Sequence, residues 1–273
     1  MIILKQTWKK IFIISLICTI FNSLAHALWA PIFKYSPPSY FVNNGIFEIS
    51  AVIALIITYI LLGIVFVYIQ NNLSGTKIEK GLRFGISFAG LWFFGILGMS
   101  LILNSPIKTE LAVGGLDFVT LIILGLLFGQ FLAIDNKQTT KNKFVETILS
   151  ILIISLIYVI GRYLFYLIFD IELAYPLKLI YTLLWTFGIG FWMGLSYILL
   201  KQSLDKFSPL KKALIFGGII IGVNWILFNL FALLLVKVSV LELLKLALSD
   251  ILLVIIGVWL TDKIINEINE KDI

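Results

Sequence analysis

The chain has 273 residues, of which 60% are hydrophobic and only 13% are charged, whereas a soluble domain has about 25% charged residues. This composition leaves too little polar surface to cover a globule in water and excludes a soluble domain of any size. The net charge of +6 is spread over short loops, so it forms no basic face of the kind that nucleic-acid binding requires. The sequence therefore predicts a protein whose main partner is a lipid bilayer, with no nucleic-acid partner.

The first apolar segment, residues 11–29, follows a lysine-rich start. This flank, the apolar core and the triplet Ala25-His26-Ala27 also fit a cleavable signal peptide. Against cleavage, the polar pair Asn22-Ser23 interrupts the end of the apolar region, and a similar segment recurs in the middle of the chain, where no signal peptide can lie. We therefore expect this segment to be retained as a transmembrane helix.

Seven further apolar segments follow, each bounded by polar, Gly or Pro residues. Each segment is long and apolar enough to be a transmembrane helix. With the first one, they cover residues 11–29, 46–69, 81–103, 116–134, 145–169, 177–200, 212–236 and 246–260. The predicted fold class is an all-α integral membrane protein with eight transmembrane helices.

The second half of the chain repeats the first at a constant offset of 132 residues. Glycine and lysine matches carry this interpretation, because apolar matches are uninformative in so apolar a chain. The pairs are Lys80/Lys212, Phe84/Phe216, Gly85/Gly217, Gly90/Gly222 and Gly125/Gly257. We predict one membrane repeat over 1–134, a cytoplasmic linker over 135–144, a second repeat over 145–262 and a cytoplasmic tail over 263–273.

Each repeat contains an even number of spans, so both repeats would cross the membrane in the same sense. This is a parallel arrangement, with a pseudo-twofold axis along the membrane normal. Most of the 21 Lys and Arg residues lie in alternate loops on the side of the two termini. Because positive loops stay inside, both termini are predicted to be cytoplasmic, and the protein is predicted to be a multi-pass protein of the cell membrane.

Glycines spaced four residues apart recur in the predicted helices. This spacing places two glycines on one helix face and lets backbones approach closely, so these residues are predicted to serve helix packing. The sharper alternative is a dimer face or a hinge. The pairs are Gly81/Gly85, Gly125/Gly129, Gly190/Gly194 and Gly218/Gly222.

Polar residues near the outer ends of the spans are the candidate site. An ionisable side chain within the bilayer costs at least about 2.5 kcal/mol, so each one requires a reason. The candidates for a substrate-binding vestibule between the repeats are His26, Arg162, Asp117, Asn229, Asp250 and Glu48. We expect His26 to be the titratable member and Arg162 to pair with one of the three carboxylates. Alternatively, these residues mark span ends and reach into the headgroups.

No catalytic, metal or cofactor motif is present. A single histidine and a single cysteine cannot build a metal site at any recognisable spacing, and phosphate- and dinucleotide-binding fingerprints are absent. The sequence thus favours a non-enzymatic protein that binds or passes a small solute or lipid between its repeats. The alternatives are a non-catalytic scaffold in a homo-oligomer or larger membrane complex and, third, a lipid-modifying membrane enzyme.

Overall fold

The computed structural model describes residues 2–31, 35–103, 105–136, 144–171 and 179–271, and these are almost entirely helical. In lipid, a helix satisfies its own backbone hydrogen bonds, which explains why apolar segments of this length take that form. The helices are α1 (Ile2–Trp29), α2 (Tyr40–Asn43), α3 (Phe47–Ile69), α4 (Lys77–Ile102), α5 (Ile107–Leu132), α6 (Phe144–Ile168), α7 (Leu179–Leu200), η1 (Lys201–Leu204), α8 (Pro209–Ala213), η2 (Leu214–Ile221), α9 (Gly222–Leu235) and α10 (Val240–Lys271).

Eight helical stretches among these residues are long and apolar enough to cross a membrane, which confirms a multi-pass membrane protein. One span combines α8, η2 and α9, and its middle turns form a π-helix. The predicted linker over 135–144 lies mostly outside the described residues. The tail beyond residue 262, predicted to be a charged helical extension, is helical as far as Lys271, because α10 continues through it.

Several helices begin earlier than their apolar segments suggest. Helix α4 starts at Lys77, where Thr76 accepts a hydrogen bond from the Glu79 amide and the Glu79 carboxylate accepts one from the Thr76 amide. This capping box fixes the start of the helix in a polar turn. Similarly, α5 starts directly after Pro106, and α10 starts at Val240. Polar first turns had been assigned to loops, so residues in these helices lie deeper than predicted.

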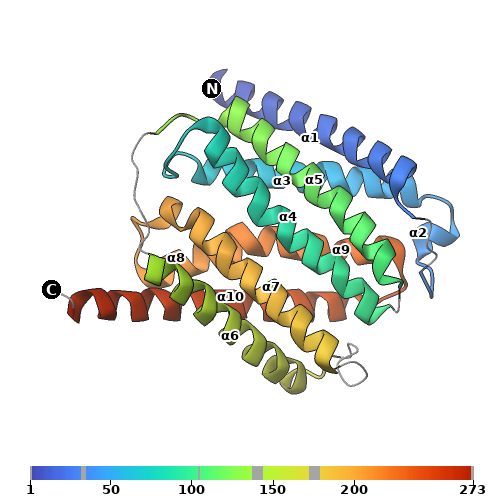
Figure 1. Ribbon diagram of the computed structural model, residues 1–273. Coiled ribbons are helices and arrows are strands. Elements are labelled where there is room, and N and C mark those ends of the chain that lie inside the picture. Colours follow the sequence, from blue (N-terminus) through green and yellow to red (C-terminus); the bar gives the residue numbers. More distant parts are fainter. Residues whose placement is uncertain (1, 32–34, 104, 137–143, 172–178, 272–273) are drawn as a thin grey trace.

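The two halves of the chain form two adjoining layers of one bundle (Figure 1). The first four long helices lie in the upper part of that view and the last four in the lower part, and both termini lie at the same end. In the first half α5 packs against both α4 and α1, and α1 packs against α3. In the second half α10 packs against both α9 and α6, and α6 packs against α7. Contacts between the halves are mainly those of α4 with α7 and of α3 with α9.

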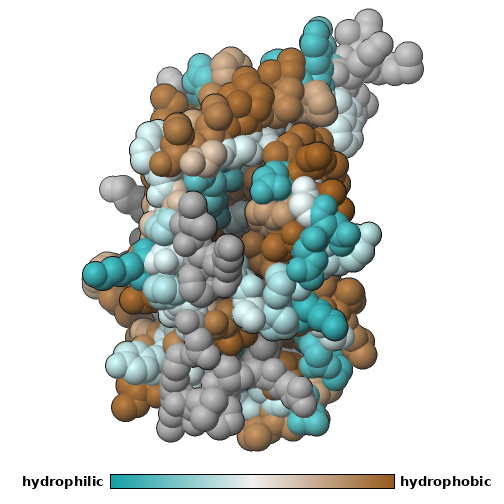
Figure 2. All heavy atoms as spheres, turned by 90° about the vertical axis from the view of Figure 1, so that its right-hand side faces the viewer, coloured by the Kyte–Doolittle hydropathy of each residue, from teal (hydrophilic) through white to brown (hydrophobic). Residues whose placement is uncertain are grey.

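The end of the bundle away from the termini carries hydrophilic side chains between apolar margins (Figure 2). Here the segment before α2 joins the halves: the Ser39 amide donates to the Leu235 carbonyl at 3.2 Å, and the Lys237 amide donates to the Pro37 carbonyl at 3.0 Å. These backbone bonds tie a loop of the first half to the turn between α9 and α10.

Candidate functional site: two intramembrane acid–base pairs

The first acid–base pair joins α1 to α5. The His26 Nε2 atom lies 2.9 Å from Asp117 Oδ1, and the Asn22 amide donates to the same oxygen at 2.7 Å. The Asn22 amide also contacts Thr120 Oγ1 at 3.2 Å. Asn22 and His26 are four residues apart, so they share one face of α1 and together hold the carboxylate. The pairing of His26 with Asp117 follows from the packing of α1 on α5.

This pair is only partly sealed from its surroundings. The side chain of His26 is 28% exposed, whereas that of Asp117 is 10% exposed. Asp117 lies ten residues after the start of α5, about 15 Å along the helix axis. The prediction that Asp117 lies at the outer start of its span is therefore wrong, because the polar first turn of α5 belongs to the helix.

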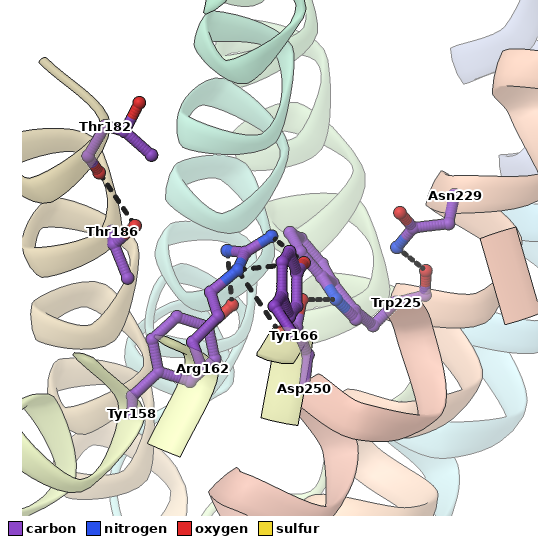
Figure 3. Close-up of polar contacts among 8 residues, drawn as sticks. All are labelled: Tyr158, Arg162, Tyr166, Thr182, Thr186, Trp225, Asn229 and Asp250. Atoms are coloured by element: carbon purple, nitrogen blue, oxygen red, sulfur yellow. Dashed lines mark hydrogen bonds and ion pairs between the residues drawn. The ribbon is translucent and has the colours of Figure 1, made fainter. Parts of the chain in front are cut away.

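The second acid–base pair joins α6 to α10 (Figure 3). Arg162 Nε lies 3.6 Å from Asp250 Oδ1, with the two side chains 2% and 0% exposed. Asp250, like Asp117, lies ten residues after the start of its helix and not at the span end that the sequence suggested. Among its three candidate carboxylates, Arg162 thus pairs with Asp250, and the pair is fully buried.

Aromatic side chains surround the Arg162 guanidinium. The Tyr166 hydroxyl accepts hydrogen bonds from Nε and Nη2 at 3.0 and 2.6 Å, and the Tyr158 hydroxyl accepts one from Nη1 at 2.9 Å. The guanidinium carbon also lies 4.5 Å from the ring centroid of Trp185. Both tyrosines stand four residues from Arg162 on α6, so one helix supplies most of the cage. These contacts offset the cost of burying a cation.

The Asp250 carboxylate has a further partner on α9. The Trp225 indole donates to Asp250 Oδ2 at 3.0 Å, and the Asn229 amide donates to the Trp225 carbonyl at 2.7 Å (Figure 3). Asn229 therefore lies beside this cluster without touching either charge directly. The first cluster needs α1 and α5, whereas this one needs α6, α9 and α10, so the structure divides the predicted vestibule residues between two clusters. Glu48 joins neither, since it is exposed in the first turn of α3.

The paired glycines of α4 and α5 lie at a direct backbone contact. A Cβ atom built on Gly81 would lie 2.4 Å from the Gly125 carbonyl oxygen, and one on Gly129 would lie 2.3 Å from the Lys77 carbonyl oxygen. A Cβ on Gly85 would lie 3.0 Å from the backbone of α5. Only glycine permits this approach.

The other glycine pairs divide differently. On α7, Cβ atoms on Gly190 and Gly194 would meet the backbone of α6 at 3.3 and 2.9 Å, as expected of packing glycines. Gly218 has no neighbour within 4 Å, so its predicted packing role is wrong. Instead, its neighbour Gly217 faces α10, because the π-helical turns change which residues point inwards. A Cβ on Gly222 would meet a side chain of α10 and its own helix.

Tryptophans fill the contact between the halves. The Trp192 ring occupies the space over Gly90, and the Trp185 ring occupies that over Gly98, so both side chains of α7 dock on α4. Each indole N–H donates to a carbonyl of α4, Trp185 to Phe94 at 2.6 Å. At the centre, the Trp92 indole donates to Asn224 Oδ1 at 2.8 Å.

Several residues of these clusters escaped sequence reasoning. Asn22 and the two tyrosines flanking Arg162 could have been found from their spacing of four residues from a charged side chain. Thr120 carried a similar signal, since it lies three residues after Asp117 on α5. Trp185 could not be found, because it comes from α7, whose packing on α6 the sequence does not specify. Within the described part of the chain, no three His, Cys, Asp or Glu side chains are grouped so that they could hold a metal ion.

Comparisons with protein-family models, with curated proteins and with solved structures found no match for this chain. Its function must therefore be argued from the two clusters themselves.

Proposed function

We propose that the protein consists of two four-helix repeats that cross the cell membrane in the same sense and that it binds, or allows passage of, a small polar solute at the His26–Asp117 cluster. Helix boundaries support the repeats. Helices α4 and α8 begin at Lys77 and Pro209, 132 residues apart. This is the same offset that the glycine and lysine matches gave.

Helix contacts support a twofold relation between the repeats. The pairs α1–α3, α1–α5 and α4–α5 correspond to α6–α7, α6–α10 and the packing of α8, η2 and α9 on α10. Between the halves, α4–α7 corresponds to α9–α3, as it should when a twofold axis exchanges the repeats. Trp92 and Asn224 are themselves 132 residues apart and bonded to each other. Equivalent positions meet only beside a twofold axis.

The binding site is proposed inside the first repeat, not at the interface that the sequence suggested. Rings of Trp185, Trp192 and Phe228 occupy the space over glycines of α4 at that interface. By contrast, the His26–Asp117 pair is partly exposed and offers groups that both donate and accept hydrogen bonds. Arg162 and Asp250 are sealed, which fits a structural role in the second repeat.

The single observation that carries the proposal is the asymmetry between the repeats. The position equivalent to Asn22 is Ile154, which is 1% exposed and lies against Gly257 of α10, so the fold accommodates an apolar residue at the same kind of helix interface. The fold therefore does not require the Asn22 amide beside Asp117, and a burial cost without a structural need points to function.

The test is solute entry into proteoliposomes, followed by light scattering at fixed pH with glycerol, urea, glycine and betaine as probes. We expect at least one solute to enter faster than into protein-free liposomes, and Asp117→Asn to abolish the difference. As a control, Glu48→Gln alters an exposed carboxylate outside both clusters and should leave entry unchanged. Entry that is the same with and without protein, for every probe, would contradict the proposal.

One observation favours a second candidate, a non-catalytic scaffold within a membrane complex. Aromatic rings pack the interface between the halves, whereas a transporter that alternates between two states would have to separate it. A scaffold would show no solute entry and would co-purify from its native membrane with a stoichiometric partner.

A further inference from the structure

We propose that the His26–Asp117 cluster also passes protons and that a row of buried hydroxyl groups on α1 and α3 extends the site from Asp117 towards the middle of the bilayer. This inference rests on the proposed function, since it concerns the same site. The hydroxyl row consists of Ser15 and Thr19 on α1 and Tyr59 on α3, and none of these residues is more than 1% exposed.

The three hydroxyl groups lack the intrahelical partner that several other buried hydroxyl groups on the spans have. Ser15 Oγ, Thr19 Oγ1 and the Tyr59 hydroxyl make no hydrogen bond within the described part of the chain. Elsewhere, buried hydroxyls on the spans bond to the carbonyl four residues earlier: Thr58 to Ala54 at 2.8 Å, and Thr120, Ser150, Ser155, Thr186 and Thr261 likewise. A buried hydroxyl group without a hydrogen-bond partner costs about 1–3 kcal/mol of stability, so three such groups on adjoining helices indicate a polar ligand between them.

The row is continuous with the acid–base pair along one face of α1. Ser15, Thr19, Asn22 and His26 recur at intervals of three or four residues, which places them on one side of the helix. Tyr59 is fully buried on α3, and α3 packs directly against α1. The row therefore begins at a partly exposed histidine and runs inwards through buried groups.

The equivalent row in the second repeat is incomplete. The residues 132 positions after Ser15 and Thr19 are Thr147 and Ile151, so only one of these two hydroxyl groups recurs on α6. The position 132 residues after Tyr59 is Phe191, which has no hydroxyl group and is 40% exposed on α7. The second half thus forms with an apolar side chain at the place of Thr19. Hydroxyl groups can both accept and donate a proton, which suits them to relay one through ordered water.

Few other charges face the site. On α5 the nearest acid is Glu110, buried near the outer start of the helix, where the Tyr35 hydroxyl donates to it at 2.9 Å. On α3 the only carboxylate is Glu48, exposed in the first turn. Asp117 is therefore the carboxylate that can exchange a proton with His26.

The transfer step conserves charge and protons. His26 takes up a proton from the outer side on Nδ1 while Nε2 holds its own proton towards Asp117 Oδ1. The Nε2 proton then passes to the carboxylate, leaving a neutral imidazole in its other tautomer and a neutral carboxylic acid. Asp117 next releases the proton to water held by the hydroxyl row, and the carboxylate is restored.

The experiment measures proton entry into proteoliposomes that contain pyranine, after external acidification, with the membrane potential clamped by potassium and valinomycin. We expect entry with the wild type and its loss in Asp117→Asn. Thr19→Val and Tyr59→Phe should each slow entry roughly fivefold, the factor for one lost hydrogen bond. The matched control is Thr58→Val, which removes a buried hydroxyl from α3 that is already bonded within its helix.

The outcomes separate this inference from the proposed function. Wild-type entry equal to that of protein-free liposomes would overturn the proton assignment. Unchanged rates in both Thr19→Val and Tyr59→Phe, or equal slowing in Thr58→Val, would overturn the role of the row. In either case Asp117-dependent entry of a neutral solute at fixed pH would leave the proposed function standing. Infrared difference spectra between acid and neutral pH give a second readout: the carboxylic acid band of Asp117 should vanish in Asp117→Asn and shift in Tyr59→Phe.

Discussion

The contact between α4 and α5 gives the sharpest prediction about stability. In Gly125→Ala, the new Cβ would lie 2.4 Å from the Gly81 carbonyl oxygen and 2.6 Å from the Gly85 Cα atom. All of these are backbone atoms, so no side chain can rotate away. To restore ordinary contact distances, the helices must separate by about 0.6–1.0 Å, a gap that forfeits a quarter to a half of the dispersion energy there.

Overpacking of this kind costs about 1–3 kcal/mol, and rigid backbone on both sides puts Gly125→Ala at the upper end, about 3 kcal/mol. For a chain of this size we expect the unfolding temperature to fall by about 6–12 °C. The assay is thermal unfolding in detergent with a thiol-reactive fluorogenic dye. Cys18 is the single cysteine and is 1% exposed on α1, so it reacts only when the bundle opens.

The matched control is Gly218→Ala. Nothing lies within 4 Å of a Cβ at this position, and alanine is favoured over glycine in a helix by about 0.5–1 kcal/mol. We therefore expect an unchanged or slightly higher unfolding temperature. The reasoning fails if Gly125→Ala unfolds at the wild-type temperature, or if both variants are destabilised equally.

Three further predictions concern the charged clusters, the centre of the interface and the orientation. Arg162→Leu should destabilise the protein by about 3–5 kcal/mol, because it leaves the buried Asp250 carboxylate without its cation. Combining it with Asp250→Leu should recover part of the lost stability. The dye assay measures both variants, and additive losses of stability would contradict the pairing. Asn224→Leu removes the acceptor of a buried indole N–H and should cost about 1–3 kcal/mol in the same assay, and a wild-type unfolding temperature would count against that bond. The orientation is tested in a background in which Cys18 is replaced by serine. A cysteine introduced at the exposed position Asn44 should react with a membrane-impermeant maleimide on intact cells, whereas one introduced at the exposed position Asp205 should react only after permeabilisation. The reverse pattern would refute cytoplasmic termini.

Within the candidate site, local spacing was informative and partner identity was not. The sequence identified His26, Asp117, Arg162 and Asp250 as costly side chains needing partners, since charge in a bilayer is costly wherever it lies. It could not assign the pairs, because two bases and three candidate carboxylates give six acid–base combinations that satisfy the same rule. The packing of α1 on α5 and of α6 on α10 selected two of them and placed them in separate halves.

Depth was misjudged for a definite reason. Both Asp117 and Asp250 were placed at span ends, because hydropathy detects the apolar core of a helix and not its capped polar turns. Helix α5 starts at Ile107 where the apolar segment suggested residue 116, and α10 starts at Val240 where it suggested residue 246. The acids thereby move about 15 Å into the helix.

The sequence by itself determined that this chain enters a bilayer through eight apolar helices, because the composition leaves too little polar surface for water and apolar runs of this length span lipid as helices. The repeat offset and the glycine spacing were also legible, since each depends on residues close in sequence or on one constant register. Only the tertiary structure decided which helices touch and which polar groups share a carboxylate. It also decided which buried hydroxyl groups have no hydrogen-bond partner among the described residues, such as those of Thr19 and Tyr59. Such contacts depend on the rotation and depth of each helix against its neighbours, and these are fixed by close packing across the whole bundle.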